Sequence, residues 1–144
     1  MVDETLILRK FTDFDEYQNQ LNEYTNVTLD EYSKDWKIQR IVERTLQILI
    51  ETGIDIANHI ISDQGFRIPT SYSDTFKVLQ ENNIINKNLY QSLEKIAKFR
   101  NLIVHNYDRI DPAFIISILR NNLNDFTNYK DSILKWMDRA RGKD

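Results

Sequence analysis

A short segment near residue 100 gathers side chains that can bind phosphate or transfer protons. It reads KFRNLIVHNYD at residues 98–108. Arg100 carries a permanent charge on a planar fork of donors, which matches phosphate oxygens. His105 is the residue type whose pKa lies near neutrality, so it suits proton transfer. Asn101 and Tyr107 add further hydrogen-bonding groups. This segment is therefore the first candidate for a catalytic or anion-binding site.

The spacing within this segment limits how its side chains can meet. Asn101 and His105 are four residues apart and share a face of a helix. Arg100 and His105 are five apart, which places them about 140° apart on a regular helix. Their convergence requires a broken helix end or a second copy of the chain. A structural interpretation stays open, because an arginine near a helix end often binds terminal carbonyls and a lone histidine often packs in the core.

The elements that position this segment are predicted to be helices. Three glycines and two prolines in 144 residues are too few for the tight turns of a sheet protein. Thr28 and Glu31 form a capping box, and Asp111 with Pro112 marks the start of another helix. We expect one all-α domain over residues 1–144, an up-and-down bundle of about five helices. These lie at about residues 2–24, 28–62, 73–82, 87–104 and from 112 onwards.

The helix expected at 28–62 is apolar over about two thirds of its circumference, which predicts a central, buried helix. A narrow polar stripe remains, which contains Arg40, Glu43, Arg44, Gln47, Glu51, Asp55 and Asn58, with His59 at its edge. The two arginines could extend an anion-binding surface, with Glu43 and Glu51 as their ion-pair partners. One histidine and two carboxylates on one helix are weak support for a metal site. We expect no metal there, and favour a buried polar network or a dimer contact.

Composition and charge exclude several classes of protein. The chain has no cysteine, so it has neither disulfides nor a thiolate zinc site. No apolar run approaches the roughly 18 residues of a membrane span, and the acidic start is unlike a signal peptide. We therefore expect a cytoplasmic protein. Its net charge of −3 is uneven, because residues 1–65 carry −7 and residues 98–144 carry +3. An anionic ligand should prefer the C-terminal third.

The residues Arg100-Asn101-Leu-Ile-Val-His105-Asn-Tyr107 resemble the Arg-x4-6-His signature of the HEPN superfamily, in the fuller Arg-Asn-x-x-x-His-x-Tyr form of its HepT-like toxin branch. Other parts of the chain look like the remaining blocks of this family, in the same order. Asn106 departs from the glycine or acidic residue of many relatives, at a variable position. The matching blocks are QRIVER at 39–44, IDIANHII at 54–61 and PTSYSDTF at 69–76, followed by Leu79.

This resemblance implies a metal-independent endoribonuclease toxin of a type II/VII-like toxin-antitoxin pair, with RNA as substrate and no cofactor. It implies a homodimer in which Arg100 and His105 of both chains line a cleft at the interface. RNA carries a 2′-hydroxyl beside every phosphodiester bond, so cleavage needs no metal-activated water. Asn101 would orient the site through hydrogen bonds, with Arg40, Glu43 and Asp55 as supporting residues. We expect neither DNA nor a membrane as a partner.

Tyr107 carries a separate hypothesis from the same resemblance. The antitoxin of the resembled family is an MntA-like minimal nucleotidyltransferase, which transfers AMP to the tyrosine of this motif. The added bulk and negative charge would exclude the RNA phosphate from the site. The alternative is an ordinary half-buried aromatic residue at a helix end.

Two other functions remain open from the sequence. One is a non-catalytic HEPN-like module that binds a nucleotidyltransferase partner or a nucleotide. The other is a helical scaffold without a ligand. RNA cleavage that resists a chelator and is lost on replacing Arg100 or His105 separates the ribonuclease from both alternatives.

Overall fold

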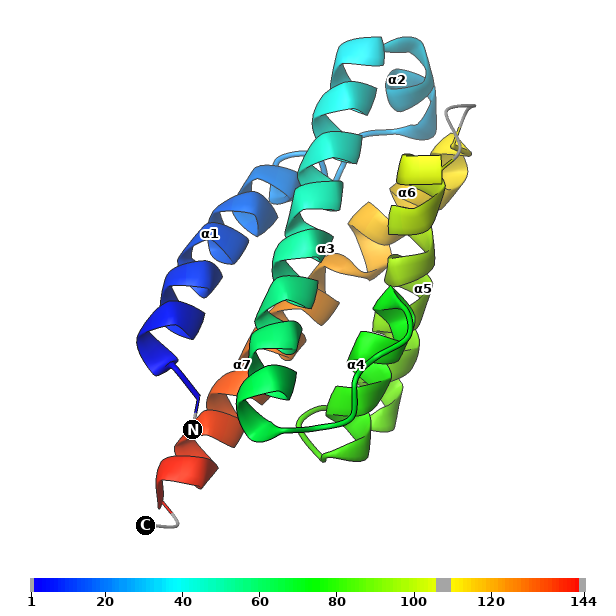
Figure 1. The fold of residues 1–144 in the computed structure, drawn as a ribbon. Helices are drawn as coiled ribbons and strands as arrows, with labels where there is room; N and C mark the ends of the chain where they lie inside the picture. The colour runs from blue at the N-terminus through cyan, green and yellow to red at the C-terminus, as the bar shows by residue number, and fades with distance from the viewer. Residues whose placement is uncertain (1, 106–109, 143–144) are drawn as a thin grey trace.

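The computed structural model of the chain describes residues 2–105 and 110–142 (Figure 1). All regular secondary structure in these ranges is α-helical, which agrees with the predicted fold class. None of the helices in them is both long and apolar enough to cross a membrane. The described ranges contain seven helices where about five were expected: α1 (Glu4–Asn22), α2 (Leu29–Lys34), α3 (Trp36–Gln64), α4 (Tyr72–Glu81), α5 (Lys87–His105), α6 (Pro112–Asn121) and α7 (Leu123–Gly142).

The prediction of one unbroken helix at 28–62 is wrong, because Asp35 interrupts it and separates α2 from α3. The capping box of Thr28 and Glu31 starts α2 as expected. Asp35 then adopts an extended backbone, with φ −117° and ψ 99°, and its side chain accepts hydrogen bonds from the first backbone N–H groups of α3. The Gln39 side chain donates to the carbonyl of Tyr32 at 2.8 Å, which satisfies a group that the break exposes.

The prediction of one unbroken last helix is also wrong. Asp111 caps α6 and Pro112 occupies its first turn, as expected. The helix ends at Asn122, which has φ −119° and ψ −5°. The Asn122 side chain donates to Asp125 at 2.9 Å in the first turn of α7 and accepts from Lys95 of α5 at 3.3 Å. The side-chain hydrogen bonds of Asn122, one to α7 and one to α5, thus accompany the end of α6 and the start of a separate helix.

The core forms around α3, which confirms the expectation of a central, buried helix. Figure 1 shows α1 on one side of α3, with α4 and α5 on the other. Helices pack closely at Gly53 of α3, where a Cβ would lie 3.4 Å from the Phe14 ring of α1. There, the buried Tyr129 hydroxyl of α7 donates to the Gly53 carbonyl at 2.7 Å. Two large apolar side chains lie on the surface, because Leu8 of α1 and Ile41 of α3 are 50% and 46% exposed.

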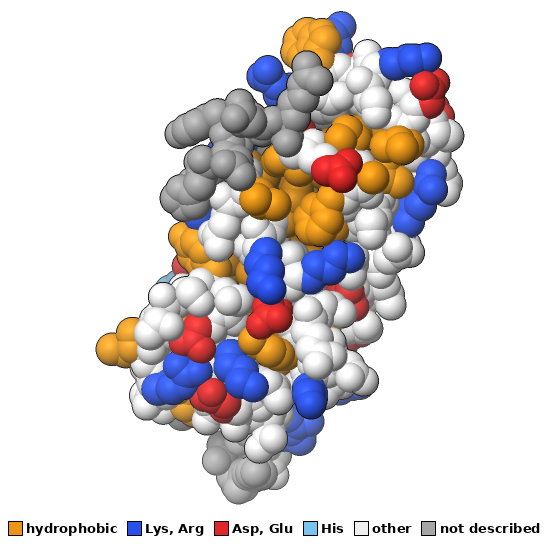
Figure 2. Space-filling view, turned by 90° about the vertical axis from the view of Figure 1, so that its right-hand side faces the viewer, with side chains coloured by type: hydrophobic (Ala, Val, Ile, Leu, Met, Phe, Trp, Pro, Cys, Tyr) orange, Lys and Arg blue, Asp and Glu red, His pale blue; other side chains and the backbone are white. Residues whose placement is uncertain are grey.

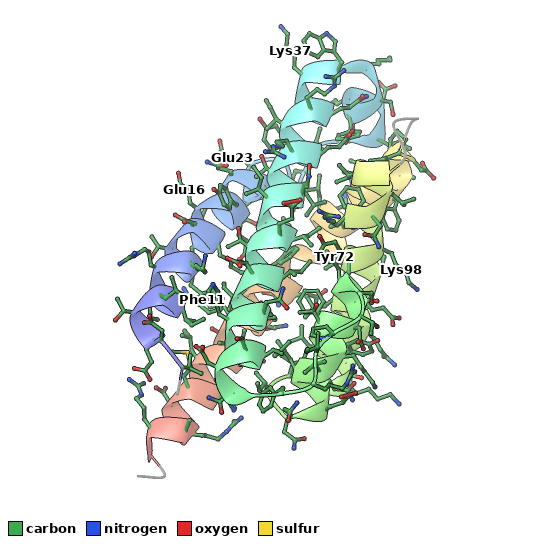
Figure 3. The ribbon with its side chains drawn as sticks, viewed as in Figure 1. Phe11, Glu16, Glu23, Lys37, Tyr72 and Lys98 are labelled. Atoms are coloured by element: carbon green, nitrogen blue, oxygen red, sulfur yellow. The ribbon has the colours of Figure 1, made fainter. Side chains whose placement is uncertain are left out.

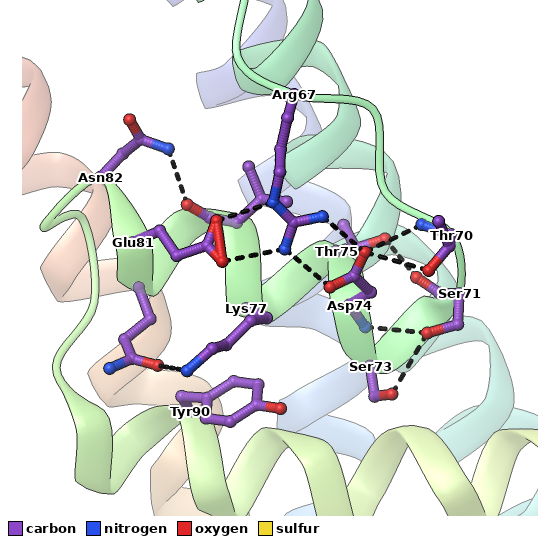
Figure 4. Close-up of polar contacts among 12 residues, drawn as sticks. Arg67, Thr70, Ser71, Ser73, Asp74, Thr75, Lys77, Glu81, Asn82 and Tyr90 are labelled. Carbon is purple, nitrogen blue, oxygen red and sulfur yellow. Dashed lines mark hydrogen bonds and ion pairs between the residues drawn. The ribbon is translucent and has the colours of Figure 1, made fainter.

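A cluster of ion pairs holds the loop between α3 and α4 in place (Figure 4). Gly65 ends α3 in the left-handed conformation, with φ +68°, which glycine adopts without strain. Arg67 in this loop makes two hydrogen bonds of 2.8 Å to Asp74 and two of 2.7 and 2.9 Å to Glu81. Asp74 also accepts from the Thr70 backbone at 2.9 Å. The loop is thereby fixed to both ends of α4.

Replacing Arg67 by methionine is expected to lower the melting temperature by a few degrees at pH 7. Hydrogen bonds from Arg67 hold the pKa values of Asp74 and Glu81 below their usual range. The stability that Arg67 supplies is therefore complete above about pH 5, and is lost as the pH falls through the lowered carboxyl pKa values. Thermal unfolding followed by circular dichroism from about pH 7 to about pH 2 measures this difference.

The matched control is Arg9→Met, because Arg9 is exposed on α1 and has no ion pair within the described residues. It should melt like the wild type at every pH. An Arg67→Met variant as stable as the wild type at pH 7 would contradict the assignment.

Candidate functional site

Arg100 is the best-defined member of the predicted site. It lies on α5 with only 15% of its side chain exposed. The guanidinium carbon is 4.3 Å from the centre of the Tyr72 ring, at the start of α4. Its Nε lies 3.4 Å from Oε1 of Glu51, on α3. Figure 3 shows Tyr72 where α4 begins, between α3 and α5. Three helices thus hold one guanidinium, through a cation–π contact and an ion pair.

The hydrogen-bonding capacity of this guanidinium is not filled. The buried Nε of Arg100 is within ion-pair distance of Glu51 but has no hydrogen-bond acceptor in the described part of the chain. A guanidinium has five N–H donors, and a buried donor without an acceptor costs free energy. Because Nε is buried and faces Glu51, an anionic oxygen can bind only at the Nη groups, which make no hydrogen bond within the described residues.

Glu51 belongs to a chain of polar contacts along α3. Its Oε1 accepts from Gln47 at 2.9 Å, and Gln47 accepts from Arg44 at 3.3 Å. The sequence predicts an arginine of the same helix as the partner of Glu51, but its ion pair in the described residues is with Arg100 of α5. Gln47 instead bridges Arg44 to Glu51. The polar stripe of α3 is thus a network that reaches Arg100.

The described part of the chain includes the backbone of His105 but not Tyr107. α5 remains helical as far as His105, its last residue, so no helix break separates Arg100 from His105. The His105 side chain lies outside what the structure describes, and so does Tyr107. The expected roles of both residues stay predictions.

Asn101 lies beside a cleft next to Arg100. Its side chain is exposed, and it lines a cleft of about 440 Å³ together with Tyr72 and Asn58. The rest of the lining comes from the loop after α3 and the start of α4. Tyr72 is shared, because its ring both contacts Arg100 and lines the cleft. The cleft therefore adjoins the candidate site, and Asn101 belongs to its wall.

Arg40 and Glu43 lie near the start of α3, about three and two helical turns from Glu51. The Arg40 guanidinium carbon is 6.0 Å from the centre of the Trp36 ring. Burial raises the pKa of Glu43, and the charge of Arg40 opposes that rise. Because α5 runs opposite to α3, its C-terminal end lies at this end of the bundle (Figure 1). Within the described residues, the contacts of Arg100 are with Glu51 and Tyr72, and neither Arg40 nor Glu43 forms an ion pair or hydrogen bond with it.

Asp55 takes part in a different set of contacts. Its carboxylate lies 2.5 Å from Lys10 of α1 and 3.8 Å from His59, one turn further along α3. The structure therefore does not bring Asp55 to Arg100, although both were expected near one site. No group of three His, Cys, Asp or Glu side chains that could hold a metal ion occurs within residues 2–105 and 110–142.

Two residues at this site escape the sequence analysis as partners of Arg100. Glu51 is assigned to the polar stripe but not to Arg100, and Tyr72 is only part of the 69–76 block. The available signal is the presence of both residues near or within blocks that resemble those of one family. A family resemblance of this kind indicates which positions are of interest, but it does not predict which side chains are in contact.

Comparison with known proteins gives a family match over most of the chain. The family described as Ribonuclease HepT-like matches residues 14–133. The mRNA nuclease HepT of Shewanella oneidensis is 35% identical over 103 residues, 72% of this chain and 77% of that protein. The tRNA nuclease HepT of Aphanizomenon flos-aquae is 28% identical over 121 residues, 84% of this chain and 82% of that protein.

A solved structure gives the same result for the fold. It contains the tri-AMPylated HEPN toxin of Shewanella oneidensis in complex with an MNT antitoxin. The toxin superposes with a TM-score of 0.83 at 30% identity, over 94% of this chain and 99% of that chain. The family match spans most of the sequence and includes Glu51, Tyr72, Arg100 and His105. The chain belongs to the HepT-like ribonuclease family.

Proposed function

We propose that this ribonuclease is a metal-independent endoribonuclease toxin, which cuts RNA by attack of a 2′-hydroxyl on the adjacent phosphorus. In this reaction the 2′-oxygen forms a bond to phosphorus, the 5′-oxygen leaves, and a 2′,3′-cyclic phosphate results. A proton leaves the 2′-hydroxyl, and another is delivered to the leaving oxygen. The protein has to bind the phosphate and move these protons.

The observation that carries the proposal is the environment of Arg100. Its guanidinium is held by Tyr72 and Glu51, yet one of its donors has no acceptor among the described residues. A fixed, planar cation of this kind stabilises charge that develops on phosphate oxygens in the transition state. We assign the scissile phosphate to Arg100.

We assign proton transfer to His105. Because α5 is continuous to His105, residues 100 and 105 lie about 140° apart around one helix. This continuity supports the pairing of two chains over a broken helix end as the way in which Arg100 and His105 meet. A two-fold dimer also supplies a second His105, so one histidine can act as base and the other as acid.

Two exposed apolar side chains are candidates for the interface of such a dimer. Ile41 of α3 and Leu102 of α5 are 46% and 40% exposed, on two helices joined by the ion pair between Glu51 and Arg100. Burying such side chains against a second copy of the chain would remove apolar surface from water, which favours association. We propose that a second copy of the chain covers them.

The Ile41→Asp variant is therefore expected to weaken dimerisation and to lower cleavage activity per chain at least tenfold at low protein concentration. A carboxylate placed in an apolar interface loses its hydration without gaining a partner. Sedimentation analysis and RNA cleavage over the same range of concentrations measure the two effects together. Leu8→Asp is the matched control, because Leu8 is equally exposed but lies on α1. A wild type that is active as a monomer contradicts the composite site.

We also propose that the chain acts in a toxin-antitoxin pair. Two relatives are named as nucleases of mRNA and of tRNA, and a structural relative is an AMPylated toxin in complex with an MNT antitoxin. The partner expected here is an MntA-like nucleotidyltransferase, with RNA as the substrate and Tyr107 as the site of AMP transfer. We expect the chain to act in the cytoplasm, where both RNA and ATP are present.

Incubation of the purified protein with single-stranded RNA in EDTA tests the proposal. We expect cleavage to continue in the chelator, with 2′,3′-cyclic phosphate and 5′-hydroxyl ends. Arg100→Ala protein purified in the same way controls for contaminating nucleases. Absence of cleavage in every class of RNA, or its loss in EDTA, rules out the proposed reaction. The first result would leave the non-catalytic binding module as the function.

A further inference from the structure

The cleft beside Arg100 is lined by uncharged residues, whereas the proposed phosphate site contains the Arg100 cation. It is formed by Asn58 on α3, Asn101 on α5 and the segment from Ile68 to Thr75. None of its lining residues is charged. A phosphate or a carboxylate would lack a cation there, so the cleft suits a neutral group. Tyr72 connects it to a charge, because its ring also contacts the Arg100 guanidinium.

The cleft contains polar groups that can form hydrogen bonds with the edge of a planar ring. The Thr75 hydroxyl donates to the Ser71 carbonyl at 3.0 Å, and the Ser71 hydroxyl accepts from the Asp74 backbone at 3.0 Å. Both hydroxyls are therefore engaged in hydrogen bonds at the start of α4. The Asn58 and Asn101 amides make no side-chain hydrogen bond with the described residues, and both are exposed. Each amide offers a donor and an acceptor side by side.

The apolar part of the cleft offers a surface for stacking. Ile68 is 85% exposed, followed by Pro69 and, at the start of α4, by the Tyr72 ring. A large apolar side chain this exposed on a loop has no packing role in the isolated chain. The loop itself is fixed by the contacts of Arg67 with Asp74 and Glu81 (Figure 4). The apolar wall is thus held in position before a ligand arrives.

A planar, neutral group that carries donors and acceptors on its edge fits this combination. In single-stranded RNA, each phosphate is flanked by such groups, since proteins recognise unstacked bases by stacking and by hydrogen bonds to their edges. A substrate whose phosphate lies at Arg100 would bring a neighbouring base to the far side of Tyr72. We propose that the cleft binds the nucleobase next to the scissile phosphate, with Asn58 and Asn101 selecting the base.

This inference rests on the proposed ribonuclease activity and adds a residue, Asn58, that selects the sequence to be cut. The test uses an RNA pool with random internal nucleotides, whose cleaved ends are sequenced. We expect the wild type to prefer one base at a fixed position beside the cut. Asn58→Ala should reduce that preference about tenfold, because one bidentate contact is lost. Asn19→Ala, at an exposed asparagine of α1, should keep the wild-type preference.

A binding measurement separates recognition of the base from cleavage. His105→Ala protein, with and without Asn58→Ala, is titrated with fluorescent 2′-O-methyl oligonucleotides that differ in one base. We expect the affinity difference between bases to disappear when Asn58 is replaced, while the weakest-bound oligonucleotide binds as before. Thermal unfolding should be unchanged, because the Asn58 side chain is exposed.

The outcomes distinguish the two levels of the proposal. No cleavage by the wild type overturns the proposed function, and this inference with it. Cleavage with no base preference, or with a preference that Asn58→Ala leaves intact, overturns only the base site. An intact preference together with weaker binding of a nucleotidyltransferase would make the cleft a protein-docking surface, which also overturns the inference.

Discussion

Replacing Arg100 or His105 by alanine is expected to lower kcat/KM for RNA cleavage by at least about a hundredfold, because each residue acts on charge that develops in the transition state. Arg100 would stabilise the phosphate oxygens, and its loss should lower kcat more than it raises KM. His105 would move protons, so its replacement should also remove the pH dependence of kcat near neutrality. A fluorogenic RNA measured at several pH values gives all of these quantities.

A second substitution at Arg100 is needed, because alanine also removes the contacts with Glu51 and Tyr72 and could disturb the fold. Arg100→Lys keeps the charge but not the planar fork, so it should remain folded and still lose most of its activity. Arg139→Ala, at an exposed arginine of α7, controls for the loss of one positive charge. Equal cleavage by all three variants and the wild type would refute the assignment.

Helix type and the positions of most helices follow from hydrophobic spacing and from caps. The signals at Thr28, Glu31, Asp111 and Pro112 begin helices where they are expected. The breaks at residues 35 and 122 do not follow, because the spacing of apolar residues continues across them. Asp35 and Asn122 end the regular hydrogen bonding by offering their own side chains to the neighbouring backbone or helix. Such local competition depends on tertiary contacts as well as on residue type.

The sequence names candidate site residues but does not give their contacts. The Arg100 segment can be found from residue types and from its likeness to a family signature. Its pairing with Glu51, 49 positions earlier in the chain, and its stacking on Tyr72 depend on how α3, α4 and α5 pack. Asp55 illustrates the same limit, since its contacts with Lys10 and His59 take it into another network.

The net charge of the chain and its distribution on the surface bear on how RNA would bind. A net charge of −3 argues against a protein that binds nucleic acid over a broad surface. On the face shown in Figure 2, basic and acidic side chains are interspersed without a continuous basic area. Arg100 is mostly buried and has its own supports, so a nuclease of this design needs only local positive charge. Binding of RNA should then depend weakly on salt, because few phosphates are neutralised.

Modification of Tyr107 is the second change expected to have a large effect. Tyr107 follows His105 by two residues, so a group attached to it lies close in the chain to the proposed proton donor. In AMP transfer from ATP, the tyrosine oxygen bonds to the α-phosphorus, pyrophosphate leaves and the phenolic proton is lost. Each added AMP carries negative charge, which repels the phosphate that Arg100 would bind. Co-expression with the proposed MntA-like nucleotidyltransferase should therefore abolish RNA cleavage.

The Tyr107→Phe variant separates this modification from simple binding of the partner. It should keep most of the cleavage activity, since no step of the proposed reaction uses the hydroxyl, and it should resist inactivation by co-expression. Intact-mass measurement should find one or more added AMP groups on the wild type and none on the variant. Tyr17→Phe, on α1, is the control and should be modified and silenced like the wild type. An unmodified wild type that is nevertheless fully neutralised would mean that the partner inhibits by covering the site, without any change to Tyr107.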